Sequence, residues 1–143
     1  MVIHAADASD LPAVRRLLET QHLPLDGIDE SVSTMVVAKQ GSRVVGAAAV
    51  ELYVDGALLR SVVVDPTVQG QGLGHRLSEA ALSIARDRGT RTAFLLTTTA
   101  EKFFPKLGFE PIVRDDVPAS VQASVEFQSA CPASAIVMRK RLA

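Results

Sequence analysis

The sequence predicts an α/β fold, a mixed central β-sheet flanked by helices, and two observations carry this prediction. Short runs of β-branched and apolar residues, bounded by turn residues, alternate with segments whose apolar residues recur at helical spacing. Near the middle of the chain, a strand leads into a glycine-rich loop, a helix and a short apolar strand, an order typical of parallel strands. The 143 residues fit a single domain, residues 1–143.

The expected elements follow from periodicity and turn signals. Asp55-Gly56 lies between two long apolar runs and predicts a hairpin, while Gly89 and Gly108 are placed to end helices. Strands are expected at residues 2–5, 35–39, 44–53, 57–64, 92–96, 109–113 and 134–139. Helices are expected at residues 10–21, 26–33, 100–107 and 118–128, with a further amphipathic helix through residues 77–85.

The composition favours a soluble, cytoplasmic protein. Apolar residues make up 48% of the chain, and a formal net charge of −1 does not favour a nucleic-acid or membrane-surface binder. No apolar run is long enough to cross a bilayer, and the first residues lack the features of a signal peptide. The single cysteine, Cys131, is expected to be a packing residue, and the three histidines lack metal-site spacing, so no metal is expected.

The central motif is Gln69-Gly70-Gln71-Gly72-Leu73-Gly74, directly after an expected strand and before an expected helix. Glycines let a ligand approach the backbone closely, and the unpaired N–H groups at a helix start favour a pyrophosphate. A dinucleotide fingerprint would need a third glycine where His75 stands, and a P-loop would need Gly-Lys-Ser/Thr. The loop therefore predicts a phosphate-bearing cofactor that neither of those motifs binds.

Three motifs in this region resemble the GNAT family of acetyltransferases. Gln69-x-x-Gly72-x-Gly74 matches the family's Gln/Arg-x-x-Gly-x-Gly/Ala loop, and residues 62–66 are similar to the strand before that loop. Residues 100–109 resemble the family's Ala-x-x-Phe-Tyr-x-x-x-Gly-Phe helix. Because the motifs occur in order over nearly the whole chain, the resemblance implies the GNAT acyl-CoA N-acyltransferase fold.

The resemblance implies that acetyl-CoA is the co-substrate. In this family the loop amides bind the pyrophosphate, and the backbone of the preceding strand pairs with the pantetheine arm. One of the two adjacent phenylalanines is expected to pack against pantetheine, with core packing of both as the alternative. The candidate coenzyme-binding residues are Val62, Val63, Val64, Gln69, Gly70, Gln71, Gly72, Leu73, Gly74, His75, Thr98, Phe103 and Phe104.

Further segments resemble two groups within the family and imply an amino-acid-like acceptor. Residues 58–64, residues 95–100 and the tail at 114–132 are similar to the arsenic-resistance N-acetyltransferases (ArsN type). Residues 96–99 and 103–104 also resemble the acetyltransferase domain of N-acetylglutamate synthases. The implied acceptor is glutamate or an arsenic-containing analogue.

Acetyl transfer needs a held thioester, a polarised carbonyl, a neutral amine and a proton for the leaving thiolate. The resemblance implies that a backbone N–H near Val63 polarises the carbonyl. Glu51, which interrupts an apolar strand, is the candidate general base, with a structural salt bridge or an outward-facing position as the alternative. Many GNAT enzymes have a tyrosine acid where this chain has Phe104, so the thiolate would be protonated by water or leave unassisted.

The candidate acceptor-binding residues are Arg60, Ser61 and Thr97. Arg60 would hold a substrate carboxylate through two hydrogen bonds, with a structural ion pair as the alternative. The threonines after the 92–96 strand would bind the acceptor or a cofactor amide, unless they serve β-propensity and an N-cap by Thr99. Glu126 is a further candidate for the acceptor pocket, together with Arg114, but a surface position is favoured for each.

These observations favour an N-acetyltransferase whose partners are acetyl-CoA and a small amino-acid-like amine, without nucleic acid or membrane. Three alternatives stay open: a general small-amine or antibiotic acetyltransferase, a non-catalytic acyl-CoA sensor, and a partner module built on the same fold. Many GNAT proteins dimerise, so a homodimer is implied by analogy alone.

Overall fold

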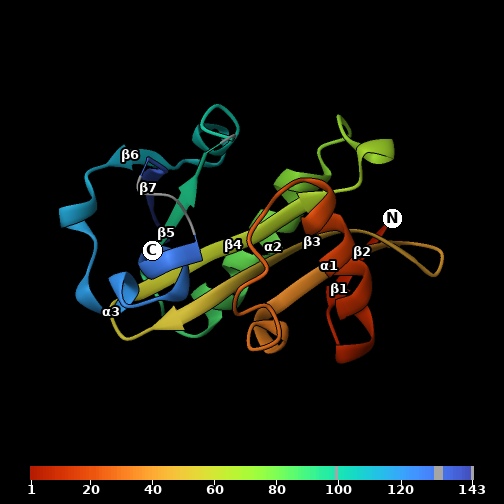
Figure 1. Ribbon diagram of the computed structural model, residues 1–143, viewed down its shortest axis with the longest axis horizontal. Helices are drawn as coiled ribbons and strands as arrows, with labels where there is room; N and C mark the ends of the chain where they lie inside the picture. Colours follow the sequence, from red (N-terminus) through yellow and green to blue (C-terminus); the bar gives the residue numbers. More distant parts are fainter. Residues whose placement is uncertain (99, 131–133, 143) are drawn as a thin grey trace.

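The computed structural model describes residues 1–98, 100–130 and 134–142. Within these residues, seven strands form one sheet with the order β1-β2-β3-β4-β5-β7-β6 (Figure 1). Neighbouring strands are antiparallel, except that β4 and β5 run parallel. The strands are β1 (Val2–Ala5), β2 (Met35–Gln40), β3 (Arg43–Tyr53), β4 (Gly56–Val64), β5 (Thr92–Thr97), β6 (Glu110–Ile112) and β7 (Ile136–Arg141).

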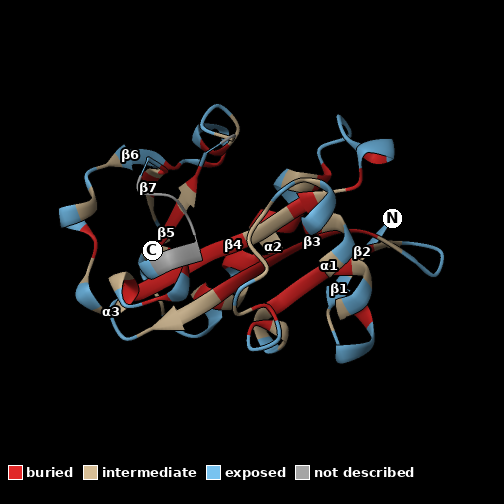
Figure 2. Cartoon of the chain, viewed as in Figure 1, coloured by how far each residue is buried: buried red, intermediate tan, exposed pale blue. Residues whose placement is uncertain are grey.

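Two longer helices, α1 (Leu11–Thr20) and α2 (Leu73–Asp87), cover opposite faces of the sheet. Val37 of β2 packs in the cluster that contains Leu18 of α1, whereas its neighbour Val36 packs in the cluster that contains Leu77 of α2. This division follows from the alternation of side chains along a strand. Figure 2 shows the buried residues concentrated along the central strands between these layers.

The short helix α3 (Ala119–Gln122) lies on the same face as α1. Its Val121 packs with Leu58 of β4 and Phe94 of β5, and the next residue of β4, Leu59, belongs to the opposite cluster. Alternation therefore directs Arg60 of β4 to the face that carries α1 and α3. The further helical turns are 3₁₀ turns at Ala8–Asp10, Val32–Thr34, Pro66–Val68, Phe104–Leu107 and Arg114–Asp116 and a π-helical turn at Glu126–Ala130.

β4 and β5 separate soon after they meet. Their parallel register contains the pairs Ala57↔Ala93 and Leu58↔Phe94, and beyond these pairs β4 continues to Val64 without β5 alongside. The edge of β4 that faces β5 is therefore left open over its C-terminal half.

A β-bulge lies in this open half of β4. Ala49 of β3 pairs with Arg60 and Ala47 pairs with Val63, so Ser61 and Val62 together oppose the single residue Ala48. Ser61 has a φ of 58°, a left-handed conformation that is uncommon for a residue with a side chain. A bulge leaves one residue of the strand unpaired, so it frees a backbone N–H group beside the separation of the strands.

The predicted strands and the helix after the glycine loop are confirmed, whereas three predicted helices need correction. Residues 26–33 form turns, because Gly27 adopts a left-handed φ of 77° and the Ser31 hydroxyl donates to its carbonyl. Residues 100–107 contain a 3₁₀ turn in which Pro105 cannot donate a helical hydrogen bond. The helix expected at 118–128 ends at Gln122, in a stretch of serine and valine with low helix propensity.

None of the helices in the described ranges is long and apolar enough to span a membrane.

Candidate active site

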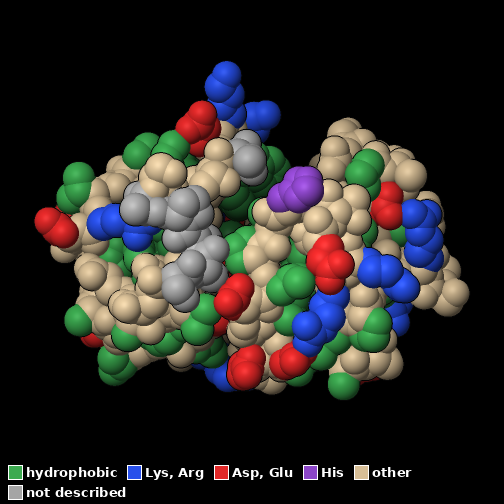
Figure 3. Space-filling view, viewed as in Figure 1, with side chains coloured by type: hydrophobic (Ala, Val, Ile, Leu, Met, Phe, Trp, Pro, Cys, Tyr) green, Lys and Arg blue, Asp and Glu red, His purple; other side chains and the backbone are tan. Residues whose placement is uncertain are grey.

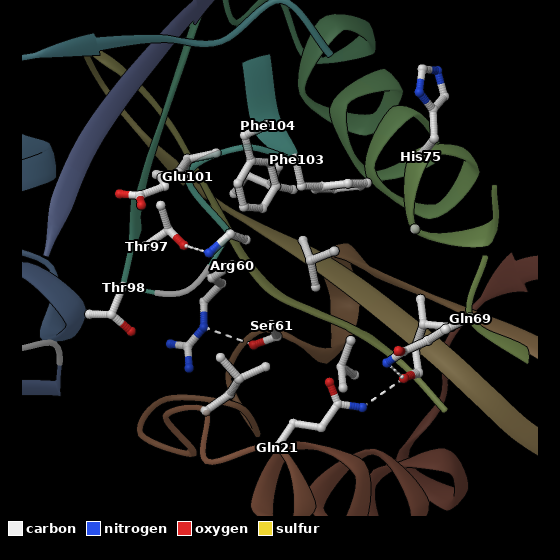
Figure 4. Close-up of a pocket in the computed structure, with 18 of the residues that line it drawn as sticks. Gln21, Arg60, Ser61, Gln69, His75, Thr97, Thr98, Glu101, Phe103 and Phe104 are labelled. Atoms are coloured by element: carbon white, nitrogen blue, oxygen red, sulfur yellow. Dashed lines mark hydrogen bonds between the residues drawn. The ribbon is translucent and has the colours of Figure 1, made fainter. Parts of the chain in front are cut away.

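A cavity of about 1270 Å³ opens where β4 and β5 separate. Its walls are the end of α1 with residues 22–24, the open half of β4, the glycine loop with the start of α2, and the segment after β5. Figure 3 shows a hollow between two lobes of the surface, and Figure 4 shows the side chains around it. Most predicted site residues line this cavity: Arg60, Ser61, Val62, Val63, Val64, Gln69, Gly70, Gly72, Leu73, Gly74, His75, Thr97, Thr98, Phe103 and Phe104.

The glycine loop ends at the first turn of α2, which begins at Leu73. Gly70 and Gly72 have positive φ angles of 85° and 76°, and open space surrounds the position where either would carry a side chain. The first N–H groups of a helix lack partners within it, and the helix dipole adds partial positive charge there. This end of the cavity is therefore suited to bind a phosphate group.

Asp65 fixes the chain as it leaves β4 for the glycine loop. Its carboxylate accepts hydrogen bonds from the backbone N–H of Thr67 at 2.9 Å and from the Thr67 hydroxyl at 2.7 Å. Arg43 of β3 forms an ion pair with the same carboxylate at 2.6 Å. The bonds from Thr67, with a smaller contribution from Arg43, hold the pKa of Asp65 below its ordinary value, so the anchor is charged at neutral pH.

Two aromatic rings close the wall that faces the glycine loop. A side chain at Gly74 would come within 3.2 Å of the Phe103 ring, so this glycine allows α2 and the ring to approach closely. Phe103 and Phe104 contact edge to face, and Phe104 packs in the buried cluster under α2. Phe103 packs, partly buried, against the same cluster, and both rings border the cavity, so the expected contact of one ring with pantetheine stays a prediction.

The edge of β4 presents backbone groups to the cavity. The N–H of Asp65 donates to the carbonyl of Val45 in β3 at 2.8 Å. Because backbone groups of adjacent strand residues point to opposite edges, those of Val64 point away from β3. Two side-chain amides, from Gln21 and Gln69, donate to the Val64 carbonyl from the cavity side.

A buried ion network lies at the other end of the cavity. The Arg60 side chain is 1% exposed; its Nη1 lies 2.9 Å from Glu51 and its Nε lies 3.1 Å from Glu126. The Tyr53 hydroxyl donates to Glu51 at 2.6 Å. Burial and the neighbouring carboxylate of Glu51 raise the pKa of Tyr53, so Tyr53 keeps its proton and donates to that carboxylate.

Comparisons with known proteins agree with this geometry. Residues 31–111 match a family model described as an acetyltransferase (GNAT) domain. An amino-acid acetyltransferase of Mycobacterium tuberculosis is 34% identical over 130 residues, which cover 84% of this chain and 74% of the relative. The chain belongs to the GNAT acetyltransferase family.

Solved GNAT structures match the whole chain. The structure of Rv2747 from M. tuberculosis in complex with CoA and NLQ has a TM-score of 0.85 and 28% identity, and the match covers 100% of both chains. The N-acetylglutamate synthase of Neisseria gonorrhoeae has the same TM-score at 22% identity and shows the fold alone. That match covers 99% of this chain and 35% of the synthase.

Some relatives are much longer than this chain. An amino-acid acetyltransferase of Ralstonia nicotianae is 31% identical over 79% of this chain but matches only 23% of its own length. The GNAT fold and the use of acetyl-CoA, both predicted from the glycine loop and its flanks, are confirmed. The protein is therefore an acetyl-CoA-dependent N-acetyltransferase of the GNAT type.

Glu51 occupies a different place from the one expected of a general base in a GNAT site. It is not among the residues that line the cavity, and its carboxylate accepts from Arg60, Tyr53 and Ser31. The geometry therefore favours the structural salt bridge that was the alternative for this residue. Gln71, at the exposed tip of the glycine loop, is likewise outside the cavity wall.

The threonines after β5 differ in their environment. Thr97 is buried, and its hydroxyl accepts a hydrogen bond from the N–H of Ala100 at 2.9 Å. Thr97 therefore caps the turn for which Thr99 was the expected cap. Thr98 is exposed beside the cavity. Thr99 and Cys131 lie outside the described residues. Among the residues that the structure describes, no group of His, Cys, Asp and Glu side chains could hold a metal ion.

Sequence reasoning missed two parts of the cavity wall. Glu126, for which a surface position was favoured, is buried at the start of the π-helical turn and pairs with Arg60. The only signal for it was its place in the segment that resembles ArsN-type proteins. Gln21 and residues 22–24 also line the cavity, and no motif indicated them.

The Gly72→Glu variant is predicted to lose coenzyme A binding, because it adds bulk and negative charge where the phosphates are expected. Gly41→Glu is the matched control, since Gly41 also has a positive φ, 64°, and open space around it but lies in the turn between β2 and β3. Calorimetry with coenzyme A should show at least a tenfold weaker Kd for Gly72→Glu, while both variants melt at similar temperatures. Wild-type affinity in a folded Gly72→Glu variant would refute the phosphate site.

Proposed function

We propose that this GNAT enzyme acetylates the amine of an amino-acid-like acceptor whose carboxylate binds Arg60. The observation that carries the proposal is the Nη2 atom of Arg60, which is buried without a hydrogen-bond partner among the described residues. The other guanidinium nitrogens face Glu51 and Glu126, and Arg60 borders the cavity. A buried donor without an acceptor is costly, and a substrate carboxylate would satisfy it.

The charges around Arg60 also favour an amino acid over a simple carboxylic acid. The guanidinium is flanked by half-buried Glu51 and buried Glu126, so one cationic group faces two acidic side chains. An acceptor that brings only a carboxylate would add to that excess, whereas an amino acid also brings an ammonium group. The same carboxylates hold the guanidinium in one orientation, which limits the entropy lost on binding.

The coenzyme would occupy the remaining length of the cavity. The N–H groups from Gly70 to Gly74 would bind the diphosphate, with His75 beside them, and the open edge of β4 would pair with the amide-bearing arm. Phe103 would pack against that arm. These roles rest on the position of each residue in the cavity wall and on the GNAT family membership.

The transfer itself would use the bulge in β4. The thioester supplies the acetyl group, and the free N–H group at the bulge, next to Val63, would donate to its carbonyl oxygen. The bound ammonium first loses a proton to solvent, and the neutral amine forms the new C–N bond while the C–S bond breaks. The nitrogen then gives a second proton to water, and the leaving thiolate takes one proton from water. Phe104 has no proton to donate, and thiolates leave readily near neutral pH.

The acceptor can be identified with a panel of amines and detection of the free thiol of coenzyme A. The names of the M. tuberculosis and R. nicotianae relatives favour amino acids, and the ArsN-like segments add organoarsenical amino acids such as arsenic analogues of glutamate. We expect turnover with glutamate-like acceptors and at least tenfold lower kcat/KM with amines that lack a carboxylate. Equal use of simple amines would favour a general small-amine enzyme. Coenzyme binding without any turnover would favour an acyl-CoA sensor.

The Arg60→Lys variant is predicted to raise the acceptor KM at least tenfold, because lysine offers no flat pair of donors to a carboxylate. The Kd for coenzyme A should change less than twofold. Arg15→Lys, at an ion pair with Asp29 away from the cavity, is the matched control.

A second measurement separates binding from a structural effect. Replacing the acceptor carboxylate by an amide should lower kcat/KM of the wild-type enzyme by a much larger factor than it lowers kcat/KM of Arg60→Lys. Equal costs in the two proteins, or an unchanged acceptor KM in the variant, would exclude Arg60 as the carboxylate site.

A further inference from the structure

Gln21, at the C-terminal end of α1, lies in the coenzyme half of the cavity but has no part in the function proposed above. Its Nε2 donates to the carbonyl of Val64 at 2.6 Å. Nε2 of Gln69, from the glycine loop, donates to the same oxygen at 3.1 Å. Figure 4 shows both side-chain amides directed at this one carbonyl. A carbonyl oxygen has two lone pairs, so the two amides occupy both.

The Val64 carbonyl is also the group that an incoming amide would use. It lies on the edge of β4 that β5 leaves open, and an extended ligand with N–H groups would bind such an edge as a further strand does. The arm of coenzyme A contains secondary amides. A ligand amide and the Gln21 amide would therefore compete for one acceptor.

We infer that Gln21 is a latch residue that occupies the coenzyme slot in the free protein and lowers the affinity for coenzyme A. Binding exchanges the hydrogen bond from Gln21 to Val64 for one from the coenzyme arm. The measured affinity for coenzyme A therefore includes the free energy needed to break the Gln21 bond. The inference rests on the proposed position of that arm along β4. Gln21, which has no role in the proposed function, would then set the strength of coenzyme A binding.

The latch also connects the coenzyme slot to the acceptor end. Gln21 directly follows α1, and the next residue, His22, has a φ of 58°, a strained conformation for a residue with a side chain. His22, Leu23 and Pro24 line the cavity, and the same segment leads to Gly27, where an added side chain would come within 3.1 Å of Arg60 and 3.5 Å of Glu51. The segment that Gln21 holds therefore borders both the coenzyme slot and the acceptor end.

The Gln21→Met variant tests the latch, because methionine keeps the length of the side chain and donates no hydrogen bond. We expect its Kd for coenzyme A to be about twofold to tenfold lower than that of the wild type, the effect of removing one competing hydrogen bond. Adenosine 3′,5′-bisphosphate, which lacks the arm, should bind both proteins equally. Gln21→Ala repeats the test without side-chain bulk.

Thr20→Ala is the matched control, since the Thr20 hydroxyl donates to the Arg16 carbonyl on the same helix and does not reach this cavity. Its affinities should equal those of the wild type. Hydrogen exchange of residues 20–25 should also become faster in the wild type when coenzyme A binds, and should already be fast in Gln21→Met.

Three outcomes would overturn the inference. Weaker or unchanged coenzyme A binding by both Gln21 variants would make the bond to Val64 structural. An equal gain in affinity for adenosine 3′,5′-bisphosphate would place the effect outside the arm. If the wild-type protein did not bind coenzyme A at all, both the coenzyme slot and the latch would be wrong. If the wild type binds coenzyme A and the Gln21 variants have the same Kd, only the latch is wrong.

Discussion

The parallel contact between β4 and β5 ends after Leu58↔Phe94, and the whole site depends on this early separation. A sheet edge in the middle of a protein would leave backbone groups without partners, which is costly unless side chains, water or a ligand satisfy them. Here the edge of β4 forms one wall of the cavity, and two glutamine amides bind its last carbonyl. The separation thus creates both the space for an extended ligand and the groups that would bind it.

The two ends of this opening have different physical characters. At one end, neutral backbone N–H groups at the start of α2 offer a partial positive charge to an anion. At the other end, Arg60 is buried between Glu51 and Glu126, and its burial is tolerable because both carboxylates contact it. Glu51 belongs to β3, whereas Glu126 follows α3, so the same contacts hold the C-terminal segment against the sheet.

The sequence predicted the parts of the site that are contiguous in the chain. The glycine loop lies directly between a strand and a helix, so its position and phosphate chemistry could be inferred from spacing alone. The acceptor end could not be inferred in this way. Arg60, Glu51 and Glu126 meet only because side chains alternate along two strands and because the segment after α3 folds back onto them. Gln21 resembles any polar residue at a helix end, and only tertiary packing directs its amide to Val64. The helix predicted at 26–33 failed for a related reason, since Gly27 adopts a left-handed conformation at a place where a side chain would meet the ion pair.

A crystal structure of the protein with coenzyme A tests the central claim most directly. The account predicts that the diphosphate oxygens lie within hydrogen-bond distance of backbone N–H groups between Gly70 and His75. It also predicts that the pantetheine amides pair with the backbone of Val62 and Val64 in the opening between β4 and β5. A diphosphate bound elsewhere on the surface, or an arm that does not contact β4, would contradict it.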